Sequence, residues 1–138
     1  MSSNVAVIGQ GYVGLPLAIA ISEVEISVTG IDKNTTLVNE LNLGNTIIED
    51  ISSDQMKLAV ESGRYSASTN YSRIKESSII LICVPTPLFD HKPDISYLLD
   101  AIKILNNEKI SIEFKNKSDK LKTELALLKM ENQSNTLK

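Results

Sequence analysis

Residues 4–14 have the sequence NVAVIGQGYVG, and this stretch decides the fold. After Asn4 come four apolar residues, three of them β-branched, which is typical of a buried strand. Gly9, Gly11 and Gly14 follow at the spacing G-x-G-x-x-G. Apolar residues then recur every three or four positions between Val13 and Ile21, which predicts a helix. A strand, a glycine turn and a helix in this order predict a site for the diphosphate of a dinucleotide.

Each glycine has its own task in such a turn. Gly9 permits the tight bend, Gly11 lets the backbone approach the diphosphate, and Gly14 lets helix and strand pack closely. Free backbone N–H groups and the positive end of the helix dipole then face the anion. A glycine-rich turn that binds nothing is the alternative for the motif taken alone.

A carboxylate follows at the distance that such a site requires. Asp32 ends a second predicted strand, residues 26–31, and lies 18 residues after Gly14. It can accept hydrogen bonds from both hydroxyls of the adenine-side ribose and would repel a 2′-phosphate. This favours NAD over NADP, although a cation at Lys33 could tolerate a phosphate. Capping of the next turn is the alternative role for Asp32.

The remaining pattern alternates helices and strands, which predicts an α/β, doubly wound parallel sheet. The apolar run Ile79–Val84 is expected to be a strand covered on both faces. The other expected elements are helices over 37–43, over 53–63 with Ser53-Asp54 as its cap, and over 96–105, with an edge strand at 66–69. Residues 110–114 and 121–130 are expected to form a further strand and a lysine-rich helix.

The chain has 138 residues, the length of about one domain. Residues 1–100 carry 6 Lys and Arg against 12 Asp and Glu, whereas residues 101–138 carry 8 against 5. This change of sign predicts a boundary between two parts of the chain. The first part, over 1–105, contains the motifs of the NAD-binding domain. The second part, over 106–138, is expected to be a divergent strand and a lysine-rich C-terminal helical tail. The three leucines of the tail fit a packing or self-association helix, but they are too few to predict a coiled coil. Self-association into a homo-oligomer therefore stays open, with a solvated end helix as the alternative.

Composition excludes several classes of partner. A net charge of −3 argues against bulk nucleic-acid binding. The single cysteine and single histidine, Cys83 and His91, argue against a metal cluster. No apolar run approaches the ~20 residues that span a bilayer, and no secretion signal begins the chain, so we expect a cytoplasmic protein without a membrane partner.

Several segments together resemble the UDP-glucose/GDP-mannose dehydrogenase family. The similarity covers about residues 4–102, and VPTP at 84–87 is its most specific element. Within the family it is most similar to the branch that oxidises UDP-N-acetylhexosamines at C6. The segments that carry it are 5–9 (VAVIG), 14–18 (GLPLA), 28–32 (VTGID), 41–44 (LNLG), 48–50 (IED), 82–88 (ICVPTPL) and 93–97 (PDISY).

This resemblance implies a Rossmann domain that binds NAD, and a second domain that completes the UDP-sugar site. It implies oxidation of the sugar C6 hydroxyl to a carboxylate with two NAD. Thr86 would contact the cofactor near its nicotinamide ribose, Asp32 would hold the adenosine ribose, and Lys33 would lie beside it. The residues implied at the diphosphate are Gly9, Gly11, Tyr12, Val13 and Gly14.

The sequence also departs from the family. The family's catalytic cysteine, lysine, asparagine and aspartate have no counterpart here, so we expect a truncated chain with no catalytic residues that alone oxidises no sugar. Cys83 lies inside an apolar strand, where desolvation disfavours the thiolate, and is expected to be an inert core residue. Glu25 stands where the family usually has a glycine ending the first helix. A left-handed non-glycine residue costs about 1 kcal/mol, so a rebuilt turn is expected there.

Two alternatives to a dehydrogenase domain stay open at this stage. Nucleotide-sensing regulatory modules of potassium-transport systems have a similar length, the same glycine loop and an acidic strand end. The segments 84–87 and 93–95 argue against them, because they resemble the dehydrogenases instead. The other alternative is a non-functional, truncated gene product whose tail came from a frameshift.

Overall fold

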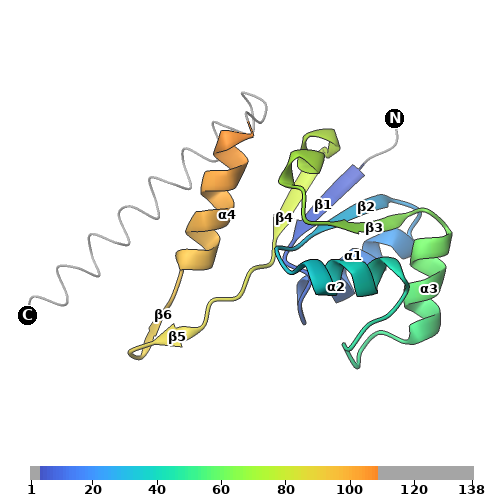
Figure 1. Ribbon diagram of the computed structural model, residues 1–138, viewed down its shortest axis with the longest axis horizontal. Coiled ribbons are helices and arrows are strands. Elements are labelled where there is room, and N and C mark those ends of the chain that lie inside the picture. Colours follow the sequence, from blue (N-terminus) through green and yellow to red (C-terminus); the bar gives the residue numbers. More distant parts are fainter. Residues whose placement is uncertain (1–3, 109–138) are drawn as a thin grey trace, which may run out of the picture.

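The structure, a computed structural model, describes residues 4–108 (Figure 1). Strands and helices alternate through most of this range. The expected strand at 110–114 and the lysine-rich helix lie outside the described residues, and the boundary between 105 and 106 stays a prediction. In chain order the elements are β1 (Asn4–Ile8), α1 (Gly14–Glu23), β2 (Ser27–Ile31), α2 (Thr35–Asn42), α3 (Ser53–Glu61), β3 (Tyr65–Ser68), the 3-10 helix η1 (Tyr71–Glu76), β4 (Ile79–Ile82), β5 (Leu88–Phe89), β6 (Lys92–Pro93) and α4 (Ser96–Asn107).

The main sheet has four parallel strands in the order β3-β2-β1-β4. Ile8 at the end of β1 lies between Ile31 of β2 and Ile82 of β4, so the three strands end level with one another. Parallel strands need crossover connections: α1 lies between β1 and β2, α2 and α3 lie between β2 and β3, and η1 lies between β3 and β4. The predicted parallel α/β sheet is confirmed.

Helices cover both faces of this sheet. Successive side chains of β1 point to opposite faces, and each set packs against different helices. Val5 and Val7 join a core with residues of α1, α2 and α3. Ala6 and Ile8 join a second core with residues of η1 and α4. Figure 1 shows α4 on the side of β4, away from α1–α3. The sheet is therefore doubly wound, as predicted.

Two of the α-helices begin at side-chain caps. The Asn34 side chain accepts a hydrogen bond from the Leu37 N–H at the start of α2, 3.1 Å away. At α3, Ser52 and Gln55 form a capping box in which each side chain bonds the other's backbone N–H. The expected cap at Ser53-Asp54 was wrong by one residue, because adjacent polar residues compete for this position and only Ser52 has the extended backbone of a cap.

The apolar strand β4 differs from its prediction. It ends at Ile82 rather than Val84, and it is half-buried rather than covered on both faces. Ile79 is 52% exposed. Within residues 4–108, β4 is one of the two edge strands of the sheet and has a neighbouring strand on one side only. An apolar run predicts a strand, but it does not distinguish an edge strand from a central one.

Residues 88–93 form a short hairpin. Strands β5 and β6 pair antiparallel, with Phe89 opposite Lys92. Asp90 and His91 form the turn between them and both have positive φ, the backbone of a tight hairpin turn. His91 is exposed.

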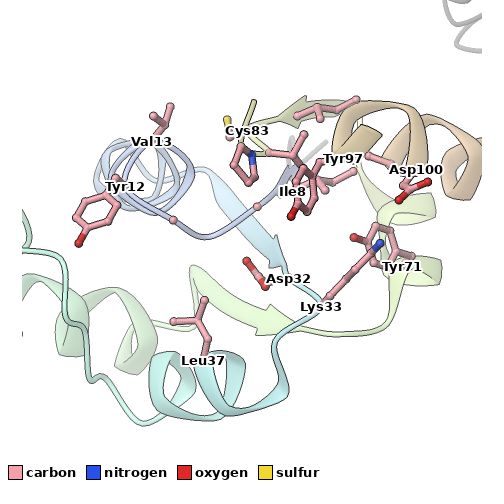
Figure 2. Close-up of a pocket in the computed structure, with 16 residues that line it drawn as sticks. Ile8, Tyr12, Val13, Asp32, Lys33, Leu37, Tyr71, Cys83, Tyr97 and Asp100 are labelled. Carbon is pink, nitrogen blue, oxygen red and sulfur yellow. The ribbon is translucent and has the colours of Figure 1, made fainter. Parts of the chain in front are cut away.

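The segment after β1 leads to α1 on one face of the sheet, and the segment after β4 leads to α4 on the other face. A crevice therefore opens between them at the carboxyl end of the sheet. Figure 2 shows Asp32 inside it, between the glycine turn and Leu37 of α2. Open parallel sheets bind ligands at such a switch point, beyond the carboxyl ends of the strands.

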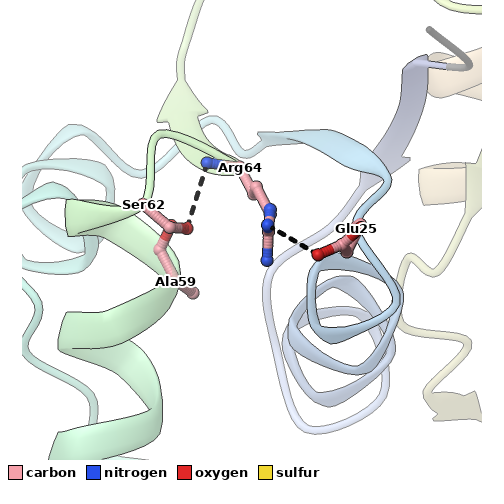
Figure 3. Close-up of polar contacts among 4 residues, drawn as sticks. All are labelled: Glu25, Ala59, Ser62 and Arg64. Atoms are coloured by element: carbon pink, nitrogen blue, oxygen red, sulfur yellow. Dashed lines mark hydrogen bonds and ion pairs between the residues drawn. The ribbon is translucent and has the colours of Figure 1, made fainter.

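The turn after α1 is not rebuilt, contrary to expectation. Glu25 adopts the left-handed conformation itself, with φ of 66°, and its N–H donates to the Ser22 carbonyl. Its carboxylate lies 3.1 Å from the Arg64 guanidinium (Figure 3). An exposed ion pair contributes at most about 1 kcal/mol, which is comparable with the cost of the left-handed backbone. The turn is therefore left-handed at a non-glycine residue that strains it.

Glu25→Gly is expected to have a free energy of unfolding roughly 0.5–1 kcal/mol higher than that of Glu25→Ala, because glycine adopts this backbone without strain. Glu25→Ala is the matched control, since it removes the same ion pair and keeps the strained backbone. Denaturant unfolding of both variants measures the effect. Equal stability of the two variants would contradict the strain.

Candidate functional site

Gly9 shapes the turn after β1. Its φ is +90°, a conformation that favours glycine. A Cβ atom there would overlap the carbonyl oxygen of Cys83 and would lie 2.9 Å from the carbonyl carbon. The Gly9 N–H donates to the Ile31 carbonyl at 2.7 Å, which ties the turn to the end of β2. Both the bend and the lack of space require glycine here.

Gly11 and Gly14 differ in their surroundings. No atom lies within 4 Å of the place where a Gly11 Cβ would be, so open space faces this backbone. A Cβ on Gly14 would instead overlap the Gly9 carbonyl and lie 3.2 Å from Cys83 Cβ. Gly14 is thus a packing residue beneath the turn, and Gly11 is its open point.

The start of α1 offers free donors. No side chain caps this helix. Within the described residues, no hydrogen bond is made by the backbone N–H groups of Gly11, Tyr12, Val13 or Gly14. Unpaired N–H groups at a helix start attract anions, and the helix dipole adds to the attraction.

Asp32 is held in a fixed orientation at the end of β2. Its Oδ2 accepts a hydrogen bond from the Gln10 N–H and its Oδ1 accepts one from the Asn34 N–H, both at 2.9 Å. A carboxylate oxygen accepts more than one hydrogen bond, so each oxygen can still accept a hydroxyl from a ligand. The alternative role, fixing the following turn, is therefore present as well, through Asn34.

These residues share a pocket of about 780 Å³ (Figure 2). Its volume lies in the range of small-molecule and cofactor sites. Of the predicted site residues, those that line it are Gly9, Gly11, Tyr12, Val13, Asp32 and Lys33. Gly14 lies beneath the lining. Thr86 is exposed and lies outside the lining, so its contact with a cofactor stays a prediction.

The pocket also has walls that the sequence did not indicate. Leu37 comes from α2, Tyr71 from η1, and Tyr97 and Asp100 from α4. Burial, together with the charge of Asp32, raises the pKa of Tyr71, so its phenol stays protonated at neutral pH. Leu37 fitted the apolar face of a predicted helix, and η1 was not predicted, so no sequence pattern distinguished these residues from core positions.

Cys83 lines the pocket and is only partly buried, which differs from the expected core position. Burial raises the pKa of its thiol, so the thiolate needed for nucleophilic attack is disfavoured. Elsewhere in residues 4–108, no three His, Cys, Asp or Glu side chains gather in a way that could hold a metal ion. None of the described helices is long and apolar enough to cross a membrane.

A parallel sheet with the order 3-2-1-4, a glycine turn opening a helix, and a carboxylate ending β2 define a dinucleotide-binding domain of the Rossmann class. The family model for the NAD binding domain of the UDP-glucose/GDP-mannose dehydrogenase family matches residues 3–115. The chain belongs to this family and corresponds to its NAD-binding domain, so the predicted family and the predicted cofactor, NAD, are confirmed.

Relatives agree with this assignment. The chain is 35% identical over 101 residues to UDP-N-acetyl-D-mannosamine dehydrogenase of Pyrococcus horikoshii, and 39% identical over 103 residues to that of Salmonella typhi. These alignments cover 72% and 73% of this chain but 24% of each relative. The chain thus spans about a quarter of the length of the curated relatives it matches.

Solved structures show the same coverage. The UDP-D-ManNAc dehydrogenase of Pyrococcus horikoshii matches with a TM-score of 0.70 and 34% identity, over 74% of this chain and 25% of that one. The GDP-mannose dehydrogenase of Pseudomonas aeruginosa, solved as a ternary complex, matches with a TM-score of 0.70 and 26% identity, over 75% of this chain and 24% of that one. These matches favour a dehydrogenase domain over the potassium-transport type of regulatory module.

Proposed function

We propose that NAD binds across this pocket, and that the chain supplies the cofactor-binding part of a UDP-N-acetylhexosamine 6-dehydrogenase. The observation that carries the proposal is one arrangement: the open backbone at Gly11, the unpaired N–H groups beside it, and the oriented carboxylate of Asp32 all belong to one site. The substrate class is supported by the relatives, which are UDP-N-acetyl-D-mannosamine dehydrogenases.

The diphosphate occupies the open space in front of Gly11. The backbone N–H groups of Gly11, Tyr12 and Val13 donate to its oxygens, and the dipole of α1 favours the negative charge. Gly9 and Gly14 act through the shape of the turn. They let the turn bend and pack closely enough for the N–H groups to face the ligand.

Asp32 accepts the hydroxyls of the adenine-side ribose and thereby selects NAD. A 2′-phosphate would bring negative charge against this carboxylate, and Lys33 at the rim offsets part of that repulsion. NAD, when bound, accepts hydride from the sugar C6. Residues 4–108 orient the cofactor for this step.

The UDP-sugar is a partner only if a second domain is supplied, as the resemblance implies. Within the same proposal the protein acts in the cytoplasm, where NAD and nucleotide sugars are metabolites. Self-association, and the expectation that residues 1–138 alone oxidise no sugar, stay predictions.

Calorimetric titration of the chain tests the proposal. We expect one NAD per chain, with an affinity in the micromolar range or weaker, because the chain spans only a quarter of its relatives. NADP is expected to bind at least about tenfold more weakly, since repulsion by Asp32 of the order of 1.4 kcal/mol suffices for that factor. No heat with NAD, or equal affinity for the two dinucleotides, would contradict the proposal.

A further inference from the structure

Gln10, the second residue of the glycine turn, turns its side chain into the protein. It is 1% exposed although Gly11 and Tyr12 beside it are open to solvent. Its amide nitrogen donates to the Val7 carbonyl at 2.8 Å and to the Gly9 carbonyl at 3.1 Å. These two bonds fix the orientation of the amide, because the flipped amide would bring its oxygen against two carbonyl oxygens.

The other end of the Gln10 amide contacts a distant strand. Its Oε1 accepts a hydrogen bond from the Tyr65 hydroxyl on β3, 2.8 Å away and 55 residues along the chain. Tyr65 is 2% exposed. Burial, together with the charge of Asp32, raises the pKa of Tyr65, so the phenol remains a hydrogen-bond donor throughout the neutral range.

Gly30 in β2 leaves room for this contact. Its φ is not in the left-handed region, so the backbone itself does not require glycine. A Cβ atom at this position would lie 2.6 Å from Gln10 Cδ and 2.8 Å from the Tyr65 oxygen. A glycine inside a strand is destabilising and often marks a close approach, which here is the Gln10–Tyr65 pair.

The pair is linked to the predicted ribose site through Gln10 itself. The side chain of Gln10 bonds to Tyr65, and its backbone N–H donates to Asp32 Oδ2 at 2.9 Å. One residue therefore joins β3, the glycine turn and the carboxylate. If the Gln10 side chain moves, the N–H that orients Asp32 moves with it.

We propose that Gln10 and Tyr65 are positioning residues that hold Asp32 and the glycine turn in the geometry that selects a dinucleotide with a free 2′-hydroxyl. This inference rests on the proposed function. Neither side chain contacts the cofactor, since both are buried behind the turn. The competing view is a core hydrogen bond that stabilises the fold and has no effect on selectivity.

Tyr65→Phe separates the two views, because it removes one hydroxyl and keeps the ring. We expect the Kd for NAD to rise about threefold to tenfold, the range for loss of one net hydrogen bond, and the preference for NAD over NADP to fall by a similar factor. Gln10→Met, which keeps a similar shape without the amide, is expected to have the same effects. Calorimetry with both dinucleotides, well below the melting temperature of each variant, measures them.

Ser22→Ala is the matched control. Its buried hydroxyl donates to the Ile19 carbonyl at 2.6 Å, inside α1 and outside the pocket lining. It is expected to lower stability and to leave both the NAD affinity and the NAD preference unchanged. A general loss of stability would affect Ser22→Ala and Tyr65→Phe alike.

Amide hydrogen exchange in the unliganded chain separates failure of the inference from failure of the proposed function. We expect the Gln10 N–H to exchange faster in Tyr65→Phe than in the unmodified chain and in Ser22→Ala. If the unmodified chain does not bind NAD, the proposed function falls, and this inference falls with it. If it binds NAD and Tyr65→Phe keeps the same Kd, the same preference and the same exchange rate, only the positioning role is overturned.

Discussion

Gly14→Ala is expected to lower the free energy of unfolding by about 3 kcal/mol, at the upper end of the usual cost of overpacking. The new methyl group would overlap the Gly9 carbonyl, which is backbone and cannot move aside without opening the turn. Cys83 Cβ, 3.2 Å away, blocks the other direction. Urea unfolding measures the loss. NAD binding is expected to fall as well, because an opened turn no longer directs its N–H groups at one point.

Gly11→Ala is the control for this result. Its methyl group would meet no atom within 4 Å, so stability is expected to stay within about 0.5 kcal/mol of the unmodified chain. NAD affinity is nevertheless expected to fall, because the methyl group occupies the space assigned to the diphosphate. Unchanged stability in Gly14→Ala, or unchanged NAD affinity in Gly11→Ala, would contradict the division of tasks among the glycines.

Asp32→Ala is expected to weaken NAD binding by at least about tenfold to a hundredfold, because a single hydrogen bond to a charged group already contributes roughly 1.5–3 kcal/mol. The substitution also leaves the Gln10 and Asn34 N–H groups without their acceptor, so part of the loss comes from a less ordered turn. Asp32→Asn keeps the shape and is expected to bind NAD more weakly than the unmodified chain. Calorimetric titration measures both variants.

The preference between dinucleotides gives a second readout for Asp32. Removal of the carboxylate removes its repulsion of a 2′-phosphate, so the discrimination against NADP is expected to narrow. Asp54 lies on the exposed first turn of α3, outside the pocket, and Asp54→Asn makes the same charge change. This variant is expected to keep both the NAD affinity and the preference for NAD over NADP. Equal NAD affinity in Asp32→Ala and the unmodified chain would remove Asp32 from the site.

The part of the site that could be predicted is local in the sequence. Gly9, Gly11 and Gly14 lie within six residues, and their spacing reflects the bend and the close packing that the structure has. Asp32 follows at the end of the next strand, where the length of one helix and one strand sets the distance. Such features depend on neighbouring residues, so periodicity and glycine spacing predict them.

The parts that could not be predicted depend on contacts between distant segments. Gln10 and Tyr65 are 55 residues apart, and no local sequence pattern around either residue indicates their hydrogen bond. Tyr71 reaches the pocket from a short 3-10 helix without apolar periodicity. Glu25 has a left-handed backbone and pairs with Arg64, 39 residues along the chain. Local propensity alone disfavours a non-glycine residue there and predicted a rebuilt turn. Ile79 is exposed on a strand at an edge of the sheet, and an apolar run does not determine which strand lies at an edge.

A crystal structure of the chain with NAD tests the central claim most directly. The account predicts the diphosphate against the backbone N–H groups of Gly11, Tyr12 and Val13, with both adenine-side ribose hydroxyls on the Asp32 carboxylate. A crevice that stays empty at saturating NAD, or one that is filled by side chains such as Tyr12, would contradict it.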